Sequence, residues 1–484
     1  MSFEWIVDAK GPRNGARYPL LDTAATRALE LSLARQRPPG FLMQQAGLAL
    51  AQLSLAVAPH ARHFWIACGR GNNGGDGLEA ASHLHRWGKA VYISMPDGDS
   101  PLPEDSARAL GRAMLSGLNI HSVPPSGWEV CIDALLGIGL RDAARGTSAS
   151  WIERMNSSGS PIIAADLPSG LLADTGAAPG PCVRATHTLC MITLKPGLFT
   201  HQGRDMCGNV WLNTLGCNAP AEPTAWLNPA PSAAERPHAS HKGNFGDVAI
   251  VGGAAGMEGA AVLAARAALQ AGAGRVYIAC LQPPATSAGM GIPADLMQRS
   301  AEDLSPSDLT AVVGCGGGAD IAALLPRWLT QSRRLVLDAD ALNAIASDEA
   351  LRGLLQQRAP DSTVITPHPL EAARLLGSSV QAVQANRLAA AGQLASSLGC
   401  TVVLKGSGSV IASPAHIPHI NPSGNASLAI GGTGDVLAGM TAAALAHSDS
   451  AWVAACRASR LHGAMADRWQ AHTQLTATRL LDYL

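Results

Sequence analysis

Residues 425–439 read Asn-Ala-Ser-Leu-Ala-Ile-Gly-Gly-Thr-Gly-Asp-Val-Leu-Ala-Gly, and this stretch is the most informative in the chain. Its glycines and threonine predict a tight turn that opens into a helix rich in alanine and leucine. Such a turn directs several backbone N–H groups and the positive end of the helix toward one point, which favours a bound anion. The sequence places a carboxylate, Asp435, at that point.

A carboxylate beside a bound phosphate is repulsive, so Asp435 needs a chemical reason to be there. It can accept the proton of a hydroxyl that attacks a phosphoryl group, while the N–H groups stabilise the developing charge. The alternative is a glycine-rich loop in which Asp435 only caps a helix. The turn alone leaves both interpretations open.

Composition narrows the class of protein. A chain of 484 residues is too long for one ordinary core, so two or three domains are expected. It is 47% hydrophobic but only 4% aromatic, and its many glycines suit α/β layers with close helix–sheet packing. A formal net charge of −1 supplies no field that would recruit nucleic acid or an anionic membrane.

The cysteines and the apolar runs bear on the cellular compartment. The ten cysteines form no C-x-x-C pair and several lie in apolar runs, so we expect reduced core thiols rather than disulfides or zinc ligands. The start of the chain has no basic segment followed by an apolar one, and no apolar run reaches the ~18 residues of a membrane helix. We therefore expect a cytoplasmic protein.

The clearest break in the chain is rich in proline. Pro220, Pro223, Pro229, Pro231 and Pro237 are interspersed with alanines and follow no apolar period. This composition predicts a linker. We therefore divide the chain into a domain at residues 1–217, a linker at 218–237 and a second domain at 238–484.

Strand-like and helix-like segments alternate in both halves. Strands are expected at residues 64–68, 91–95, 130–132, 162–165, 248–251, 276–279, 311–313, 335–337, 364–365 and 402–404. Helices are expected at residues 23–36, 78–87, 259–270 and 384–398. This alternation predicts parallel sheets covered by helices on both faces, with ligands at the carboxyl ends of the strands.

A glycine-rich segment in the first half, Gly69-Arg-Gly-Asn-Asn-Gly-Gly-Asp-Gly77, formally satisfies G-x-G-x-x-G. It differs from an ordinary dinucleotide clamp, because Asp76 would lie where a pyrophosphate should bind. Asn72 and Asn73 offer carbonyl oxygens as well as N–H donors, so the loop could hold a cation beside a ligand. The alternative is a tight turn with solvated side chains.

Two further acids follow apolar strands of the first half. Asp133 and Asp166 each close an apolar run and precede turn residues. That position predicts side chains at the rim of the sheet rather than in a core. Together with the glycine loop they predict one site.

The first half resembles the NAD(P)H-hydrate epimerase family. The similarity is carried by GNNGGDG, DALLGIGL, DLPSGLLADTG and LKPGL between residues 69 and 197, with a weaker match over residues 18–47. It implies a Rossmann-like three-layer α/β/α domain with Asp166 as general acid/base. It also implies potassium ligands at Asn73, Asp133 and Ser169. The implied substrate contacts are Asn72, Asn73, Gly74, Gly75, Asp76, Asp166 and the loop Gly137, Ile138, Gly139, Leu140, Arg141, Asp142, Ala143.

The second half carries several strand-end motifs besides the Asp435 turn. Asp338 and Asp340 end one strand and could serve Mg²⁺ or position a substrate. His368 lies between two prolines at the end of another, where the alternative is a surface turn. Lys405-Gly-Ser-Gly-Ser409 offers a cation and backbone N–H groups suited to a nucleotide phosphate. No G-x-x-x-x-G-K-[ST] motif occurs, which excludes a Walker-type site.

This half is similar to the ribokinase-like superfamily, and within it to ADP/ATP-dependent NAD(P)H-hydrate dehydratase. The similarity is carried by HKGNFG, DADALN, TPHP, LKGSG and GGTGDVLAG between residues 238 and 447. It implies a ribokinase-like α/β/α domain with Asp435 as the catalytic base. It implies that Lys405, Gly406, Ser407, Gly408, Ser409 and Gly434 bind the adenylate, and that Ala260, Gly316, His368 and Asp435 line the hydrate pocket.

Four positions depart from the pattern of these families. Arg70 stands where the epimerases favour proline, and Ile138 where they favour threonine. Cys315 and Leu370 stand where the dehydratases usually have proline and glycine. Arg70 could help to bind phosphate, while Ile138 removes a hydroxyl from its loop. The other two changes are uncharged, so we expect them to alter shape more than chemistry.

Together the two resemblances imply a bifunctional repair enzyme for hydrated nicotinamide cofactors. It would epimerise the R and S forms of NADH hydrate and NADPH hydrate and dehydrate the S form, with ADP as phosphoryl donor yielding AMP and phosphate. The implied ions are K⁺ for the epimerase and Mg²⁺ for the dehydratase. We expect a homo-oligomer without nucleic-acid or membrane partners.

Two other interpretations remain open from the sequence, and a third fails. A small-molecule kinase fused to a regulatory nucleotide-binding domain would share the fold and the base but release a phosphorylated product. A non-enzymatic sensor would bind nucleotides in both halves. An NAD oxidoreductase lacks a hydride-transfer site that we can place. The sequence does not decide between ADP and ATP.

Overall fold

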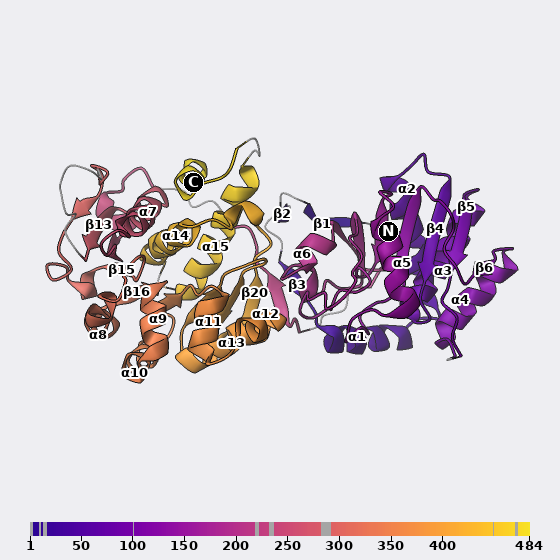
Figure 1. The fold of residues 1–484 in the computed structure, drawn as a ribbon, viewed down its shortest axis with the longest axis horizontal. Coiled ribbons are helices and arrows are strands. Elements are labelled where there is room, and N and C mark those ends of the chain that lie inside the picture. Colours follow the sequence, from indigo (N-terminus) through magenta and orange to yellow (C-terminus); the bar gives the residue numbers. More distant parts are fainter. Residues whose placement is uncertain are drawn as a thin grey trace. The chain divides into compact units, whose positions relative to one another are not determined.

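The computed structural model describes residues 3–8, 11–12, 17–99, 101–217, 222–231, 237–281, 292–448, 450–469 and 473–484. The chain forms two compact units, made chiefly of Tyr18–Ala225 and Trp226–Leu484, which we call the first and second unit. Each is drawn in its own range of colours in Figure 1. Within the predicted linker, residues 218–221 and 232–236, including Pro220, lie outside the described residues, and Ala225–Leu227 forms strand β11.

The first unit is built on a largely parallel sheet. Its strand order is β2-β1-β10-β9-β8-β7-β4-β5-β6. β1 pairs antiparallel with β2 and β10, and the other pairs are parallel. The bounds are β1 Glu4–Asp8, β2 Gly11–Pro12, β4 His63–Cys68, β5 Ala90–Ser94, β6 Ile120–His121, β7 Val130–Ala134, β8 Ile162–Ala165, β9 His187–Met191 and β10 Asn209–Asn213.

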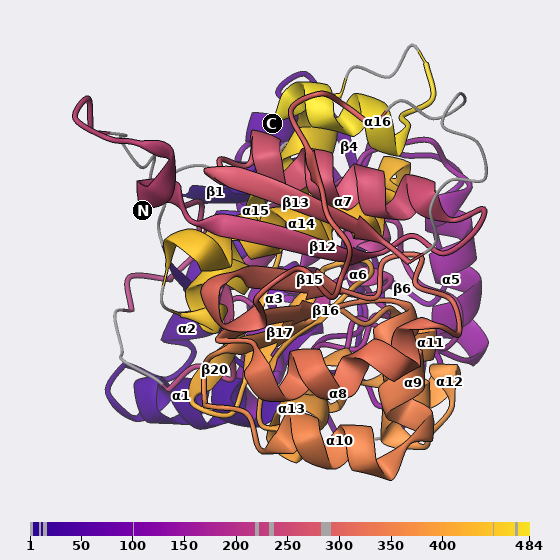
Figure 2. The same cartoon turned by 90° about the vertical axis from the view of Figure 1, so that its left-hand side faces the viewer.

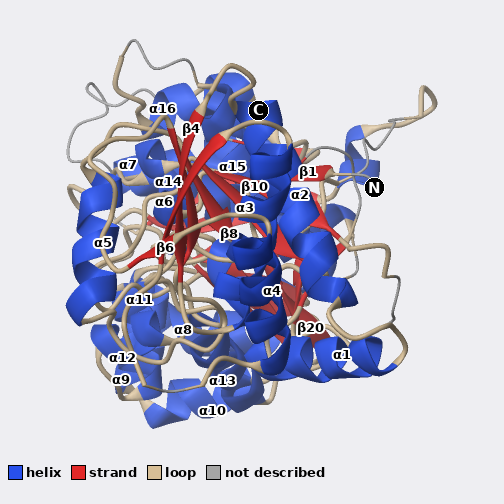
Figure 3. Cartoon of the chain, turned by 90° about the vertical axis from the view of Figure 1, so that its right-hand side faces the viewer, coloured by secondary structure: helices blue, strands red, loops and turns tan. Residues whose placement is uncertain are grey.

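Helices cover both faces of this sheet. Helices α2, α3 and α4 lie over one face and α5 over the other (Figure 3). Each face has its own buried apolar cluster, which is the three-layer arrangement predicted from the alternating segments. The remaining bounds are β3 Tyr18–Leu20, α1 Thr23–Arg35, α2 Phe41–Val57, α3 Asn72–Arg86, α4 Glu104–Leu115, α5 Gly146–Asn156, η1 Pro196–Leu198 and α6 Gly203–Met206.

The glycine-rich segment of the first unit is helical, which corrects the prediction of a loop before a helix at residue 78. Helix α3 already begins at Asn72. A Cβ atom on Gly74 would lie 1.8 Å from the Gly69 carbonyl oxygen, and one on Gly77 would lie 2.7 Å from Ala134 Cβ. These glycines therefore permit the helix to press against the strand ends, which outweighs their weak helix propensity.

The second unit has a longer sheet with the order β14-β13-β12-β15-β16-β17-β18-β19-β20-β11. Pairing is parallel from β14 to β18, whereas β19 is antiparallel to both of its neighbours. The bounds are β11 Ala225–Leu227, β12 Asp247–Gly252, β13 Arg275–Cys280, β14 Met297–Gln298, β15 Thr310–Val313, β16 Arg334–Leu337, β17 Thr363–Ile365, β18 Thr401–Leu404, β19 Val410–Ser413 and β20 His416–Ile420.

This sheet also lies between two helical layers (Figure 2). One layer contains α7 Glu258–Gln270, α14 Thr433–His447, α15 Ala451–Arg468 and α16 Ala477–Leu480. The other contains α8 Ile321–Gln331, α9 Asp340–Ser347, α10 Glu349–Gln356, α11 Pro369–Leu376, α12 Val380–Ala385 and α13 Arg387–Leu398. Single 3-10 turns occur at η2 Lys242–Phe245, η3 Pro306–Asp308, η4 Ala426–Leu428 and η5 Leu481–Tyr483.

Helices α7 and α14 approach each other at backbone distance. A Cβ atom on Gly439 of α14 would lie only 2.0 Å from the carbonyl oxygen of Ala264 on α7. Small residues at such a crossing let two helix backbones touch. This contact sets the position of α14, the helix that carries Asp435.

Two global expectations can be compared with the structure. All ten cysteines are free thiols, and Cys280 and Cys456 are the two that are only partly buried. Among the described residues, no helix combines the length and the apolar character needed to cross a bilayer.

Candidate active sites

The first unit contains a cavity of ≈ 760 Å³ beside the ends of β4, β7 and β8. Eight of the predicted contact residues line it: Asn72, Asn73, Asp76, Gly137, Ile138, Gly139, Leu140 and Asp166. Gly74, Gly75, Arg141, Asp142 and Ala143 are not among its lining residues. Parallel strands thus bring the two predicted segments to one cavity, as expected for a sheet of this type.

Asp166 lies directly after β8 in a left-handed backbone conformation, with φ of 63°. Its Oδ1 accepts hydrogen bonds from the Lys195 ammonium and, at 3.0 Å, from the Met191 amide. A non-glycine residue in this conformation is uncommon and occurs where surrounding structure enforces it. The two donors to Oδ1 hold the carboxyl group in one orientation.

Lys195 is the partner that sequence reasoning did not assign. Its side chain is 0% exposed, and its ammonium also donates to the carbonyl oxygens of Thr193 at 3.0 Å and Met191 at 3.3 Å. Burial is the largest single effect on the pKa of Lys195 and lowers it, but the adjacent Asp166 carboxylate, with Cys190 and Glu30, raises the pKa overall. The pair is therefore charged. The LKPGL motif contained this lysine, yet only the fold places it beside Asp166.

Three more acids, Glu30, Asp76 and Asp105, line the cavity. Burial raises the pKa of Asp76 well above its ordinary value, and the charges of Asp166, Glu30 and Glu79 add to the effect. Burial also raises the pKa of Glu30, which extends from α1 and which the sequence did not single out. The cavity therefore holds carboxyl groups whose pKa is raised by burial, a pattern typical of acid–base sites.

The three residues implied as potassium ligands come together around the segment 135–137. Ser169 Oγ lies 2.6 Å from Asp133 Oδ1 and accepts from the Leu136 amide at 2.8 Å. Asn73 Nδ2 donates to the Leu136 carbonyl at 3.1 Å. Such a group of amide, hydroxyl, carbonyl and carboxylate oxygens suits a hard cation.

The prediction that the Asp133 side chain lies at the rim of the sheet is wrong. Asp133 lies within β7 and is 0% exposed. Burial raises its pKa to about 6, although donors from Ser169 and Leu135 counteract that effect. Ser169 contacts both the Asp133 carboxyl group and the Leu136 amide, and so holds the turn after Asp133 over that carboxyl group. The local sequence does not reveal this contact between distant segments.

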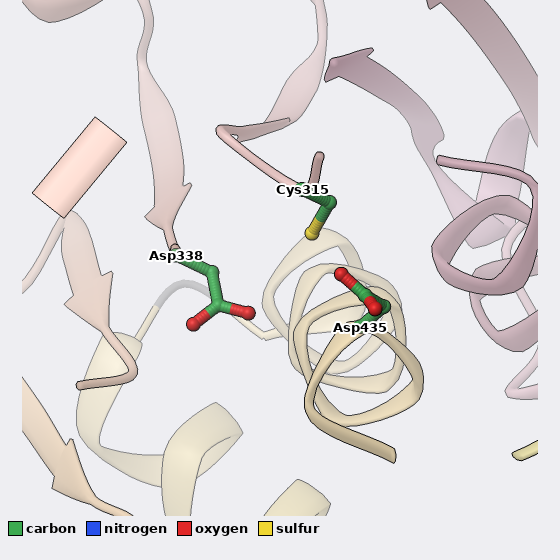
Figure 4. Close-up of side chains that lie close together, drawn as sticks. All are labelled: Cys315, Asp338 and Asp435. Atoms are coloured by element: carbon green, nitrogen blue, oxygen red, sulfur yellow. The ribbon is translucent and has the colours of Figure 1, made fainter. Parts of the chain in front are cut away.

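In the second unit, Asp435 projects from the first turn of α14, whose N-cap is Gly432. Figure 4 shows Asp435 with Cys315 and Asp338, whose side chains point toward one another. Their nearest ligand atoms all lie within 4.8 Å of one another. Burial and then the charge of Asp338 raise the pKa of Asp435 to about 6, while a hydrogen bond from the Cys315 thiol works in the opposite direction.

Lys405 completes this cluster. Its ammonium lies 2.7 Å from Asp338 Oδ1, and the Asp338 side chain is 2% exposed. A Cβ atom on Gly434 would lie 3.3 Å from Lys405 Nζ. The structure therefore brings Lys405 of the LKGSG motif to Gly434 and Asp435 of the GGTGDVLAG motif.

The rest of the predicted adenylate loop turns between β18 and β19. Gly406 has φ of 138°, and a Cβ atom on it would lie 2.8 Å from a guanidinium nitrogen of Arg387. Arg387 is buried and donates to the carbonyl oxygens of Leu404 and Lys405, both at 3.1 Å. Gly408 has φ of 61°, while the Ser409 hydroxyl donates to the Gly406 carbonyl at 3.2 Å and its carbonyl accepts from Asn421. Ser407 lies in the same turn.

The predicted hydrate-pocket residues lie in two locations, one where Gly316 meets Ala260 and one at the start of α11. Gly316 and Ala260 are neighbours, since a Cβ atom on Gly316 would lie 3.0 Å from Ala260 Cβ. His368 is the N-cap of α11, where its Nδ1 accepts from the amides of Leu370 at 3.1 Å and Glu371 at 3.3 Å. Burial lowers the pKa of His368 and the nearby Lys405 adds to this effect, so the ring is neutral.

The cluster can be tested for its fit to Mg²⁺. The thiol of Cys315 is a soft ligand that Mg²⁺ does not favour, and it is engaged with Asp435. Asp338 and Asp435 offer carboxylate oxygens of the type that Mg²⁺ does use, together with phosphate oxygens of a nucleotide. The donor set therefore fits Mg²⁺ carried on a phosphate better than an ion held by protein alone.

Comparison with known proteins gives matches in both units. The family described as YjeF-related protein N-terminus matches residues 40–197, and the family described as NAD(P)H-hydrate dehydratase matches residues 248–484. The chain is 38% identical to the bifunctional NAD(P)H-hydrate repair enzyme Nnr of Escherichia coli (strain K12) over 88% of this chain and 84% of that protein. The chain belongs to the family of bifunctional NAD(P)H-hydrate repair enzymes.

A second curated relative agrees with this assignment. A bifunctional NAD(P)H-hydrate repair enzyme Nnr of Vibrio cholerae serotype O1 is 36% identical over 96% of this chain and 94% of its own length. Among solved structures, ADP/ATP-dependent NAD(P)H-hydrate dehydratase from Bacillus subtilis, co-crystallised with ATP/Mg²⁺, is 29% identical, with a TM-score of 0.42, over 51% of this chain and 91% of that chain.

The predicted α/β fold class is confirmed, because each unit is a largely parallel sheet between two helical layers and each matches the expected family. The four departing residues lie in different surroundings. Arg70 and Ile138 line the first-unit cavity, and Cys315 contacts Asp435. Leu370 is 44% exposed near the start of α11.

Proposed function

We propose that this chain repairs hydrated NADH and NADPH in two steps, epimerisation in the first unit and nucleotide-dependent dehydration in the second. The observation that carries the proposal is that each unit holds a carboxylate beside a lysine-containing ion pair. Asp166 is itself paired with Lys195, and Asp435 lies beside Asp338, which is paired with Lys405. These clusters lie in the two segments that match the repair-enzyme families.

The dehydration step uses phosphorylation to improve a leaving group. Hydroxide leaves a ring carbon poorly, whereas phosphate leaves readily. Asp435 accepts the proton of the substrate hydroxyl as this oxygen attacks the terminal phosphoryl group. The backbone amides at the start of α14 and the Lys405 ammonium stabilise the negative charge that develops.

The nucleotide in this proposal is ADP, which is converted to AMP while the phosphorylated hydrate eliminates phosphate. The turn 405–409 and Gly434 receive its phosphates, because Gly434 leaves room beside Lys405. Mg²⁺ bound with the nucleotide would neutralise phosphate charge, and the Asp338 carboxylate, of which only Oδ1 faces Lys405, would hold it. Gly316, Ala260 and His368 shape the hydrate pocket.

The epimerisation step supplies the S form that a shaped dehydratase pocket accepts. Asp166 transfers a proton at the hydrated carbon of the nicotinamide ring, held in place by Lys195 and Met191. Asn72, Asn73, Asp76 and the loop 137–143 contact the nucleotide. K⁺ held by Asn73, Asp133 and Ser169 would balance charge at the buried Asp133 carboxyl and keep the segment 135–137 in place.

A direct assay tests this function. Chemically hydrated NADH, mixed with the enzyme, ADP and Mg²⁺, should regain the absorbance of the reduced nicotinamide ring. Asp435→Asn should stop this repair but leave epimer exchange intact, and Asp166→Asn should do the reverse. Stable accumulation of a phosphorylated small molecule would favour the kinase, and nucleotide binding with neither activity would favour the sensor.

Parallel assays with ATP and with NADPH hydrate establish which donor and which substrate are preferred. A homo-oligomeric assembly and a cytoplasmic location stay predictions. Sedimentation of the purified chain and fractionation of cells that produce it would test them.

A further inference from the structure

Among the carboxyl groups that line the first-unit cavity, those of Asp166 and Asp76 have contrasting surroundings. Asp166 Oδ1 receives the buried Lys195 ammonium and the Met191 amide. All three N–H donors of the Lys195 ammonium are engaged, because it also donates to two backbone carbonyl oxygens. Asp166 is therefore a charge-balanced carboxylate whose Oδ2 remains for a ligand.

Asp76 enters the same cavity from α3. Within the described part of the chain, no hydrogen bond or ion pair holds its carboxyl group. The charged groups that face it are Glu30 on α1, Glu79 on α3, Asp166 after β8 and Lys195, and three of these four are negative. Glu79 is itself paired with Arg112 of α4. An unpaired carboxyl group among negative charges favours its neutral form, and burial acts in the same direction.

We infer that Asp76 is a second catalytic residue of the epimerase site, a neutral acid that protonates the departing hydroxyl while Asp166 accepts a proton from the incoming water. The inference rests on the proposed epimerase function and extends it. Two carboxyl groups whose environments separate their acidities can divide the roles of acid and base in this way.

The chemistry of the substrate defines the bonds involved. Water adds to an enamine double bond with its oxygen on the carbon beside the ring nitrogen. In the reverse step that C–O bond breaks, the proton of Asp76 moves to the departing oxygen and water leaves. The lone pair of the ring nitrogen fills the resulting electron deficiency, giving an iminium ion.

Water then adds to the opposite face of the iminium carbon. A new C–O bond forms, the electron pair returns to nitrogen, and Asp166 takes the proton of the added water. The product is the other epimer, with Asp76 ionised and Asp166 protonated. The reverse epimerisation uses the same two groups in exchanged roles, as microscopic reversibility requires. Proton exchange with solvent restores the starting state.

The first test compares Asp76→Asn with Asp205→Asn in the full-length enzyme. Asparagine keeps the shape of Asp76 but cannot supply its proton, so kcat for epimerisation should fall by about 100-fold or more. KM should change by less than about threefold, because binding contacts are preserved. Asp205, an exposed acid on α6, should give unchanged values. Thermal unfolding of the full-length variant, compared with the parent enzyme, shows whether the first unit is folded, because dehydration of the S form reports only on the second unit.

The second test follows the oxygen atom. Epimerisation in heavy-oxygen water should introduce one solvent oxygen for each epimer formed, and Asp76→Asn should slow exchange and epimerisation equally. Retention of the original oxygen would indicate ring opening at the C–N bond instead and would overturn the inference.

The kinetic outcomes distinguish a failure of the proposed epimerase function from a failure of the role inferred for Asp76. If Asp166→Asn leaves epimerisation intact, the proposed function of the first unit fails. If Asp166→Asn abolishes it while Asp76→Asn keeps the full rate, or changes only KM, the proposed function stands and Asp76 is not the acid. Loss of the rate in Glu30→Gln but not in Asp76→Asn would assign the acid to Glu30 and equally contradict the inference.

Discussion

Lys405 forms an ion pair with Asp338 across the carboxyl ends of β18 and β16, with 2.7 Å between Nζ and Oδ1. Asp338 is almost fully buried, and the Lys405 side chain is 19% exposed. The pair keeps a carboxylate beside the proposed phosphate path without leaving its charge uncompensated. Burial opposes the charge of Lys405, but Asp338 and Glu371 outweigh burial and raise the pKa of Lys405.

Replacing Lys405 by Met should impair both stability and nucleotide binding. Loss of the ammonium leaves Asp338 as an unpaired buried charge, which typically costs about 3–5 kcal/mol of unfolding free energy. Thermal unfolding and titration with ADP measure the two effects. Lys242→Met removes an exposed lysine of η2 and serves as the control. Unchanged ADP affinity in Lys405→Met would contradict the role given to this residue.

Gly434→Ala should separate stability from activity. Alanine favours a helix over glycine by about 1 kcal/mol, so the unfolding free energy should hold or rise. The added methyl would lie 3.3 Å from Lys405 Nζ, in the space proposed for phosphate, so dehydratase kcat/KM should fall at least tenfold. Gly392→Ala on α13 adds the same methyl where nothing lies within 4 Å. Equal activity in the two variants would exclude phosphate from the space beside Gly434.

The Lys195–Asp166 pair should behave as a coupled unit. Lys195→Met leaves the largely buried Asp166 carboxylate unpaired and should lower the unfolding free energy by about 3–5 kcal/mol. Adding Asp166→Asn removes that charge and should restore part of the loss, while epimerase activity stays absent. Denaturant unfolding of the four members of the cycle measures the coupling. Additive losses would show that the two side chains do not interact energetically.

His462 should make the second unit sensitive to acid. Burial lowers its pKa to about 4, and its Nε2 lies 2.9 Å from the Thr433 carbonyl at the start of α14. The folded pKa is below the ordinary value of 6.5, so the unfolded chain binds a proton first as the pH falls. Stability contributed by neutral His462 is thus retained above pH ~6.5 and lost toward pH ~4, by about 3 kcal/mol in all.

His462→Gln should flatten this pH dependence, measured as the denaturant midpoint between pH ~4 and ~7. His419 has a pKa lowered by burial in the same way and is present in both proteins, so the difference between them isolates His462. An identical slope in the variant would show that the ring is protonated in the folded state.

Much of the framework could be predicted from local pattern. Short apolar runs such as Val248–Val251 and Ile162–Ala165 became central strands, because buried parallel strands are apolar on both faces. Strands β1, β9, β10, β19 and β20 were not predicted, since their sequences mix polar residues with apolar ones. The predicted start of helix α3 was six residues too late, because its glycines resemble those of a turn. In the structure these glycines permit close packing against the strands.

The sites were predictable as sets of motifs but not as electrostatic pairs. Asp435, Asp166 and the strand-end loops were found because turn chemistry marks them. The lysine partners of Asp166 and Asp338 come from distant positions, 29 and 67 residues away along the chain. No local rule brings Lys195 to Asp166 or folds Ser169 over Asp133. Such pairings follow from strand order, which only the tertiary fold reveals.

The touching backbones of α7 and α14 have a mechanical consequence for catalysis. Gly439 meets Ala264 one helical turn beyond Asp435, so it lies on the same side of α14 as the carboxyl group of Asp435. A larger residue there would tilt α14 and displace the proposed base without altering a single polar group. The alignment of this carboxyl group with a bound phosphate would thus depend on a group that is missing, the methyl that glycine lacks.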